Sequence, residues 1–416
     1  MNIGVVTTWF ERGAGYVSKA YVKTLAKQHR VFVYARGGET YGKGDPNWDL
    51  PFVTFGPRWY NPVFPLDSAM SRSNFWKWIR QHNIAVLLFN EQRHIGLVKS
   101  VRRCGIICGT YVDYYTKETV KDFAAYDFLV CNTRRHYSVF KDHPCVFYVP
   151  WGTDTTVFVP RPSPLSFDEG VVFFHNAGYG AANCRKGTDL VVEAFQRVTG
   201  HARLIIHSQT APESFGRRTM ATIARDRRIR FMHKTVAAPG LYHMGHVYVY
   251  PSRLDGIGLS LPEALSTGLP AITTDCAPMN EFVEDGYNGL LVRVARVAQR
   301  WDRYYWPETE ADVADLSQKM QLYVNDKSLI REHSVHARSW ACEYGDWSKN
   351  SKLLPQYFSA CAASTRGVHC PATNLMSWVL RDCLVLLTFL LSRPAQPLWQ
   401  MLRRVRFRHE KCKHYG

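Results

Sequence analysis

Several common functional signatures are missing from this chain, and each absence excludes a class of protein. The sequence has 11 cysteines among its 416 residues, but no C-x-x-C pair and no regular cysteine spacing. Nothing near Cys104 and Cys108, the closest two, completes a zinc site, so we expect reduced, buried thiols. There is no G-x-S-x-G turn, which argues against a serine hydrolase. There is also no G-x-G-x-x-G loop with a downstream acid, which argues against NAD chemistry.

A secretion signal is missing as well. The first ten residues, MNIGVVTTWF, enter a strand pattern at once, without a basic segment, a long apolar stretch or a cleavage site. We therefore expect a cytoplasmic protein.

Composition and charge indicate a globular protein that attracts phosphate. The contents of 46% hydrophobic and 21% charged residues exclude a disordered chain, and a length of 416 residues predicts two domains and a tail. The 52 Lys and Arg residues outnumber the 35 Asp and Glu residues, which gives a formal net charge of +17. Such an excess favours phosphate on nucleotides, lipids or nucleic acid without choosing among them.

Two successive series of apolar, strand-like runs alternate with helical stretches. Such alternation is typical of parallel sheets with crossover helices, and it predicts two Rossmann-like domains. A linker at residues 148–166 separates the two series, because its prolines fit neither a helix nor a central strand. The expected strands are 3–8, 31–35, 86–89, 106–112, 128–132 and 146–150 in the first series, and 171–178, 203–208, 229–232, 247–252, 270–275 and 289–292 in the second.

The most informative segment is residues 247–292, where two acids stand eight positions apart. Asp255 lies in a glycine-containing loop after a strand, and Glu263 lies on the helix that follows. A helix N-terminus favours anions, and carboxylates beside it suit the hydroxyls of a ribose or sugar. An ordinary strand–turn–helix unit with incidental acids is the alternative. The pattern predicts a site for a nucleotide sugar.

This segment resembles the donor-site signature of the retaining GT-B glycosyltransferases of family 4, the glycosyl transferases group 1 domain. The family pattern places E-x7-E inside P-S-x-x-E-G-F-G-x-x-x-x-E-A-x-x-x-G-x-P. Asp255 replaces the first Glu, which keeps the charge and shortens the side chain by a methylene. A second family pattern, P-x-G-x-D-x-x-x-F-x-P, lies in the linker. The matching residues are Pro251, Ser252, Gly256, Gly258, Glu263, Ala264, Gly268 and Pro270 in the first pattern, and Pro150, Gly152, Asp154, Phe158 and Pro160 in the second.

The resemblance implies an α/β protein of the GT-B fold, in which two Rossmann-like domains face each other across a cleft. Residues 1–155 would form the N-terminal acceptor domain, and residues 166–345 the C-terminal nucleotide-sugar donor domain. Residues 346–362 would form a helix that crosses back to the N-terminal domain. Residues 363–416 would be an extra tail with an apolar and basic helix.

The resemblance also implies cations for the diphosphate of the donor. A cation at Lys186 would stabilise the charge that builds on the leaving phosphate, whereas a solvated lysine at a helix start is the alternative. Where the family has its second cation, after a glycine, this chain has Gly178–Tyr179, so Arg185 is the nearest substitute. Because no D-x-D acid pair occurs in the sequence, we expect neither a metal nor another cofactor. The family's K-G-x-D-x-x-x-x-A element matches Lys186, Gly187, Asp189 and Ala194.

Two further loops are expected to contact the donor. Gly13 and Gly15 precede a helix from about Tyr16, so that backbone N–H groups can approach a phosphate or sugar closely. Glu281 occupies the acidic position that the family uses against the sugar, with a capping or surface carboxylate as the alternative. The expected donor-binding residues are Gly13, Gly15, Arg185, Lys186, Asp255, Gly256, Ile257, Gly258, Glu263, Pro278 and Glu281.

The first domain offers weaker catalytic candidates. Family members often carry a His in a V-H-D-like stretch, and the equivalent G-T-Y-V-D-Y-Y here keeps Asp113 without that His. His94, at the end of another strand, is the other candidate, although a lone His is more often structural. The expected catalytic residues are Glu263, Asp255, Lys186 and Asp113.

The tail combines an apolar stretch with a basic end. Residues 375–391 are almost wholly apolar but contain Arg381 and Asp382, so they fall short of the ~20 residues of a membrane span. Trp399 and clustered Arg and Lys residues follow, which suits an interfacial anchor on an anionic membrane. A helix packed on the protein, a true span and a nucleic-acid contact are the alternatives.

The sequence thus predicts a hexosyltransferase-type enzyme that moves a sugar from a nucleotide diphosphate sugar to an acceptor hydroxyl. The expected partners are the donor, a glycan, glycolipid or other lipid-linked acceptor or a glycoprotein glycan, and an anionic membrane surface, with no nucleic acid. Two alternatives share the fold. One is a non-catalytic subunit that binds a nucleotide sugar or a lipid, and the other is a nucleotide-sugar hydrolase or epimerase.

Overall fold

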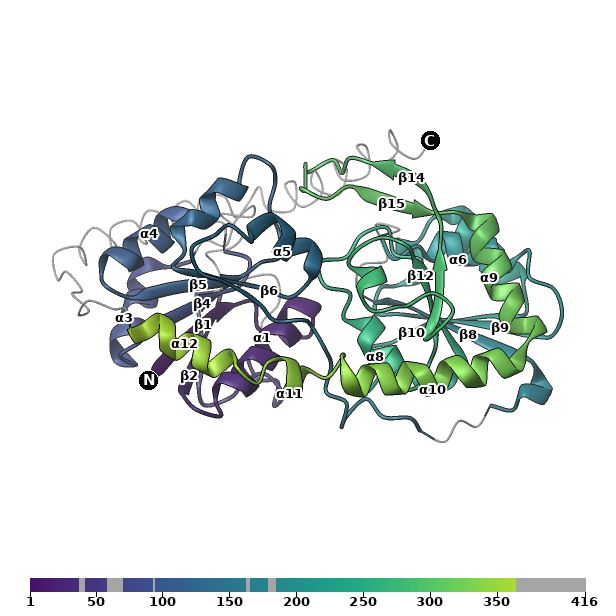
Figure 1. Ribbon diagram of the computed structural model, residues 1–416, viewed down its shortest axis with the longest axis horizontal. Coiled ribbons are helices and arrows are strands. Elements are labelled where there is room, and N and C mark those ends of the chain that lie inside the picture. The colour runs from purple at the N-terminus through teal and green to yellow at the C-terminus, as the bar shows by residue number, and fades with distance from the viewer. Residues whose placement is uncertain (37–41, 58–69, 93, 162–164, 179–184, 364–416) are drawn as a thin grey trace. The chain divides into compact units, whose positions relative to one another are not determined.

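The computed structural model describes residues 1–36, 42–57, 70–92, 94–161, 165–178 and 185–363 (Figure 1). The tail predicted at residues 363–416 therefore lies outside the described residues, apart from Ala363. The described chain forms two compact units. The first contains residues 1–109 and the described residues from Phe358, and the second contains residues 110–357.

The first half of the chain contributes a 7-stranded sheet with the order β3-β2-β1-β4-β5-β6-β7. Strand β1 pairs in parallel with both β2 and β4, so the first strand of the chain is central, as in a Rossmann-like domain. The strands are β1 (Asn2–Thr7), β2 (Arg30–Ala35), β3 (Val53–Phe55), β4 (Val86–Phe89), β5 (Ile107–Tyr111), β6 (Phe128–Cys131) and β7 (Val146–Tyr148). The helices are α1 (Gly13–Leu25), α3 (Arg72–Gln81), α4 (Ile95–Arg103), α5 (Arg134–Phe140) and the short η1 (Val120–Ala125).

The start of α1 corrects one prediction. Gly13 and Gly15 lie in the first turn of the helix and do not precede it, because α1 begins at Gly13 and not near Tyr16. A Cβ atom on Gly15 would stand 2.2 Å from the carbonyl oxygen of Phe10. Close packing of the preceding loop against the helix therefore requires a glycine there, although glycine is a poor helix former.

The second unit contains a 6-stranded sheet with the order β10-β9-β8-β11-β12-β13, in which all neighbouring strands are parallel. Its strands are β8 (Val171–Gly178), β9 (Ala202–Ser208), β10 (Ile229–His233), β11 (Val247–Tyr250), β12 (Ala271–Thr274) and β13 (Gly289–Val292). The helices from this point on are α6 (Thr188–Phe195), α7 (Arg217–Arg225), α8 (Ser260–Ser266), α9 (Val313–Asn325), α10 (Lys327–Glu343), α11 (Trp347–Asn350) and α12 (Leu354–Ala363), with short turns η2 (Phe167–Glu169), η4 (Pro212–Ser214), η5 (Tyr242–Met244) and η6 (Met279–Glu281). The segment 346–362, which we expected to be one helix, thus contains α11 and most of α12.

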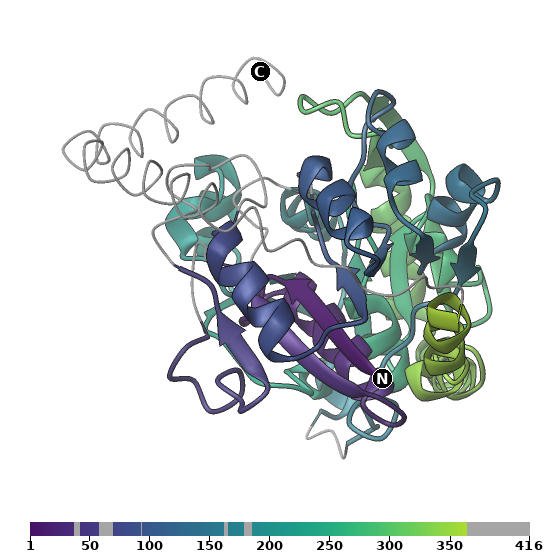
Figure 2. The same cartoon turned by 90° about the vertical axis from the view of Figure 1, so that its left-hand side faces the viewer.

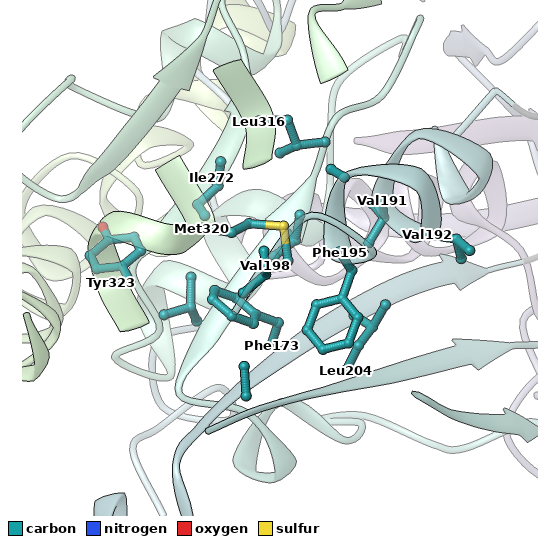
Figure 3. Close-up of a cluster of buried hydrophobic side chains, with 14 of the residues drawn as sticks. Phe173, Val191, Val192, Phe195, Val198, Leu204, Ile272, Leu316, Met320 and Tyr323 are labelled. Carbon is teal, nitrogen blue, oxygen red and sulfur yellow. The ribbon is translucent and has the colours of Figure 1, made fainter. Parts of the chain in front are cut away.

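The strands predicted in the second series all form, within a few residues of their expected ends. Apart from the edge strand β10, they are buried along nearly their whole length, as in a parallel sheet that is covered on both faces. On one side of the sheet, α6 and α9 pack against each other and close a hydrophobic cluster (Figure 3). Residues from both helices and from the strands meet there, among them Phe173, Val191, Phe195, Leu204, Leu316, Met320 and Tyr323.

Strand β3 and one further element were not expected from the sequence. The further element is an antiparallel hairpin of β14 (Val294–Ala298) and β15 (Glu308–Ala311), which follows β13 and precedes α9 (Figure 1 and Figure 2). Four consecutive residues of β14 are exposed, so its sequence lacks the alternation by which a half-buried strand is recognised. The hairpin segment, defined as residues 294–311, carries the aromatic residues Tyr304, Tyr305 and Trp306 just before β15.

The core of the second unit gives a first prediction. Leu316 and Leu322 both lie on α9, but Leu316 is fully buried whereas the side chain of Leu322 is 42% exposed. Leu316→Ala should lower the free energy of unfolding by about 2 to 5 kcal/mol, because a cavity forms in a packed core. Leu322→Ala is the matched control and should change it by less than about 0.5 kcal/mol. Denaturant unfolding measures both, and equal effects would contradict the assigned packing of α9.

Candidate functional site

The loop that carries Asp255 joins β11 to α8 and is called the acid loop, residues 251–258. The Asp255 carboxylate accepts hydrogen bonds from the Lys186 ammonium and from the Tyr250 hydroxyl. Burial alone would raise the pKa of Asp255, but the charges of Lys186 and Arg185 and these hydrogen bonds hold it well below its usual range. Asp255 is therefore ionised, and it forms a largely desolvated ion pair with Lys186.

The turn at residues 185–187 brings Lys186 against the acid loop. Gly187 has a φ of +71°, and a Cβ atom there would stand 2.2 Å from the carbonyl oxygen of Pro251. Only a glycine fits this combination of left-handed backbone and close approach. The backbone N–H of Arg253 donates to the carbonyl of Arg185 at 2.7 Å, which fixes the two segments to each other. Arg185 and Lys186, which were selected from the sequence, thus lie beside the loop that carries Asp255.

Glu263 lies in the first turn of α8 and is only partly exposed. Its carboxylate accepts a hydrogen bond of 2.6 Å from the Tyr242 hydroxyl. Burial raises the pKa of Glu263 to about 7, against the opposing effects of Tyr242 and of the Lys186 charge. Tyr242, from η5, also lines a separate cavity of about 540 Å³ between the linker and α10, whereas neither acid lines it.

Arg253 connects three segments around the acid loop. It is only 4% exposed, and its guanidinium binds the Asp189 carboxylate with two parallel hydrogen bonds of 2.8 and 2.7 Å. The same guanidinium binds Glu310 of the hairpin segment at 3.1 and 3.2 Å. Asp189, which the sequence pattern placed in the K-G-x-D element, therefore anchors the acid loop to α6.

Glu281 contacts the N-terminus of α5. Its two carboxylate oxygens accept from the backbone N–H groups of Arg134 and Arg135 at 2.6 and 2.9 Å. The capping arrangement, which the sequence left open as the alternative for Glu281, is the one that the structure shows. Contact of Glu281 and of the neighbouring Pro278 with a sugar stays a prediction.

Helix α5 also reaches the acid loop through two side chains that no sequence motif had indicated. The Arg135 guanidinium donates to the Asp255 carbonyl, and at 2.6 Å to the Ala277 carbonyl. The His136 ring contacts the Gly256 carbonyl, with Nε2 and the oxygen 3.1 Å apart. These residues are more than 100 positions from the loop in sequence, so no local motif could have indicated them.

The remaining expected residues are placed as follows. Gly13, Gly15 and His94 belong to the first unit. His94 caps α4, where its Nδ1 atom accepts from the backbone N–H of Leu97 at 3.1 Å. Asp113 belongs to the second unit, and its carbonyl accepts from the Tyr304 hydroxyl at 2.9 Å. Catalytic roles for these side chains stay predictions.

Among the residues that the structure describes, no group of three or more His, Cys, Asp or Glu side chains is placed to hold a metal ion. Within the same part of the chain, no helix combines the length and the apolar character that crossing a membrane requires.

The unusual carboxyl of Glu263 gives a second prediction. A glutamate titrates near 4.5 when unperturbed, so its raised pKa of about 7 means that the folded protein binds the proton more tightly than the unfolded chain does. The resulting contribution to the free energy of unfolding is fully present below about pH 4.5 and is lost as the pH rises to about 7. Glu263→Gln lacks this titration. Raising the pH from 5 to 8 should therefore lower its free energy of unfolding by about 1 to 3 kcal/mol less than that of the wild type. Denaturant unfolding of both proteins at both pH values measures the difference, and identical pH dependence would contradict it.

Known proteins resemble parts of this chain in sequence. Residues 175–304 match the family described as Glycosyl transferases group 1. The lipopolysaccharide core biosynthesis mannosyltransferase LpsB of Rhizobium meliloti (strain 1021) is 28% identical over 124 residues, or 27% of this chain and 35% of that protein. The D-inositol 3-phosphate glycosyltransferase of Arthrobacter sp. (strain FB24) is 28% identical over 169 residues, or 38% of this chain and 40% of that protein. The chain thus matches less than half the length of either relative.

Solved structures extend the likeness over most of the chain. Sucrose-phosphate synthase from Thermosynechococcus elongatus superimposes with a TM-score of 0.68 at 15% identity, covering 87% of this chain and 99% of that one. HepE of Anabaena, solved in complex with UDP and glucose, gives a TM-score of 0.67 at 13% identity, covering 86% of this chain and 100% of that one. At such identities the likeness shows the fold alone. This chain therefore has the α/β fold of the GT-B glycosyltransferases, as predicted, and its residues 175–304 match the glycosyl transferases group 1 family.

Proposed function

We propose that this protein is a retaining glycosyltransferase of family 4, which moves a hexose or similar sugar from a nucleotide diphosphate sugar to an acceptor hydroxyl. The observation that carries the proposal is the grouping of Lys186, Asp255 and Glu263 around the start of α8. This group lies inside the matched domain, residues 175–304. It combines a largely buried cation with one ionised carboxylate and one carboxyl group whose pKa is about 7.

The cation suits the leaving group. When the bond between the sugar and the diphosphate breaks, negative charge builds on the phosphate, and a preorganised cation stabilises that charge. Burial lowers the pKa of Lys186, but the adjacent Asp255 carboxylate opposes that shift. A diphosphate beside Lys186 and Arg185 would supply a second anionic partner and favour the charged lysine further. In the retaining mechanism, the leaving phosphate itself helps to deprotonate the incoming hydroxyl.

The two acids suit the sugar and ribose. The ionised Asp255 carboxylate can accept hydrogen bonds from hydroxyl groups, and the partly exposed Glu263 can accept or donate one near neutral pH because its pKa is about 7. The relatives support a nucleotide-sugar donor. HepE was solved in complex with UDP-glucose, and the two sequence relatives are named a mannosyltransferase and a glycosyltransferase.

The third prediction concerns donor binding. One of UDP-glucose, UDP-galactose and GDP-mannose should raise the melting temperature of the protein, because a ligand that binds only the folded state stabilises it. Glu263→Gln should abolish transfer from that donor and weaken its binding about tenfold or more, since a hydrogen bond to a charged group contributes about 1.5 to 3 kcal/mol. Glu169→Gln is the control, because Glu169 is exposed on η2 and should behave like the wild type. Wild-type transfer by Glu263→Gln would contradict the donor-site assignment.

The same assay separates the alternatives. Complete turnover of the donor without any acceptor would indicate a nucleotide-sugar hydrolase or epimerase. Tight nucleotide binding with neither hydrolysis nor transfer would indicate a binding subunit.

The fourth prediction concerns the tail. We expect the apolar and basic segment after Arg366 to attach the protein to anionic membrane surfaces. Truncation before Arg366 should abolish sedimentation with liposomes that contain phosphatidylserine. Neutral phosphatidylcholine liposomes are the control and should bind the full chain weakly. Unchanged sedimentation of the truncated protein would contradict the anchor.

A further inference from the structure

A chain of hydrogen bonds connects the hairpin segment to the acid loop. The indole N–H of Trp306 donates to the Tyr115 hydroxyl oxygen at 2.7 Å. The Tyr115 hydroxyl and the Nδ1 atom of His136 are 2.9 Å apart, and the Nε2 atom of His136 and the Gly256 carbonyl are 3.1 Å apart. Tyr115 and His136 are fully buried.

The chemical nature of the two end groups determines which atom is the donor in each of these three hydrogen bonds. An indole nitrogen can only donate, and a carbonyl oxygen can only accept. The Tyr115 hydroxyl therefore donates to Nδ1, and Nε2 carries the hydrogen that is donated to Gly256. Burial and the Arg135 charge lower the pKa of His136 to about 3, so the ring is neutral at physiological pH. The donors and acceptors of these hydrogen bonds therefore stay the same at that pH.

The hairpin segment holds the acid loop at a second point. The backbone N–H of Thr309 donates to the Arg253 carbonyl at 2.9 Å, and Glu310 binds the Arg253 guanidinium. The loop is thus fixed at Arg253, two residues before Asp255, and at Gly256, one residue after it. Both points of attachment depend on the hairpin segment, residues 294–311.

We infer that the hairpin segment and α5 position Asp255 through the chain Trp306–Tyr115–His136, with His136 as a positioning residue and not as an acid or base. The inference goes beyond the proposed function by assigning a role to the hairpin segment, and its consequence for the donor rests on that function. A backbone held on both sides keeps the carboxylate of Asp255 at one place relative to Lys186. A carboxylate that must meet particular hydroxyls benefits from such preorganisation.

Two substitutions at His136 separate positioning from proton transfer. The amide of His136→Gln offers one donor and one acceptor, so it can keep both hydrogen bonds, whereas His136→Leu loses both. Tyr323→Phe is a matched control, because the Tyr323 hydroxyl and the Nδ1 atom of His333 form a similarly buried pair, 2.8 Å apart, on α9 and α10.

Amide hydrogen exchange of the full chain is the first measurement. In His136→Leu, exchange of the peptide that covers residues 251–258 should accelerate about tenfold or more, the factor that corresponds to ~1.4 kcal/mol. His136→Gln should exchange this peptide within about twofold of the wild type, and Tyr323→Phe should leave it unchanged. A wild-type rate in His136→Leu, or equal acceleration in His136→Gln, overturns the inference. If His136→Leu does not fold, Tyr115→Phe decides instead, and a wild-type rate in that variant overturns it.

Donor affinity is the second measurement. For whichever of UDP-glucose, UDP-galactose and GDP-mannose binds the wild type, His136→Leu should weaken binding about tenfold, whereas Tyr323→Phe should leave it within about twofold. Wild-type affinity in His136→Leu overturns positioning of Asp255. If none of these donors binds the wild type, the proposed function fails, and the exchange experiment still decides whether the hairpin segment holds the loop.

Discussion

The contact between Lys186 and Asp255 is the interaction around which the acid loop of this protein is organised. Each partner would be costly to bury alone, because a charge that leaves water needs a counter-charge and hydrogen bonds nearby. Lys186 has both the Asp255 carboxylate and the Tyr250 hydroxyl. The pair therefore requires the turn at residues 185–187 and the acid loop to stay in register. Gly187 meets this requirement, since its left-handed backbone lies directly against Pro251.

The second acid, Glu263, has different surroundings from Asp255. Asp255 has a cation and is ionised, whereas Glu263 has the neutral Tyr242 hydroxyl as its hydrogen-bond partner and titrates near pH 7. At a pH below about 7, Glu263 is mostly protonated while Asp255 stays ionised, so the two carboxyl groups differ in charge. The difference comes from their partners and from burial.

Much of this arrangement could be predicted from the sequence, and the reason is locality. Asp255, Glu263 and Lys186 lie in short patterns whose glycines and strand–helix order carry their own signal. The strands of the second sheet were predicted for the same reason, because they are continuous apolar runs. The start of α1 was placed too late, since propensity alone does not show that Gly15 packs against Phe10.

What could not be predicted depends on contacts between distant segments. Tyr242 meets Glu263, and His136 meets Gly256, only after the chain has folded. The hairpin of β14 and β15 escaped for a different reason, because its exposed first strand has no buried face to set a pattern. Tyr242, His136 and the residues of the hairpin all lie outside the short motifs that predicted the donor site.

The bonds of Arg253 have a practical consequence for protein engineering. Its guanidinium ties the acid loop to Asp189 at the start of α6 and to Glu310 in the hairpin segment at the same time. A graft of residues 251–258 from another protein would bring in a loop that lacks the bonds to Asp189 and Glu310. The natural unit of exchange is therefore discontinuous, and it consists of the loop, the first turn of α6 and the hairpin segment transplanted together.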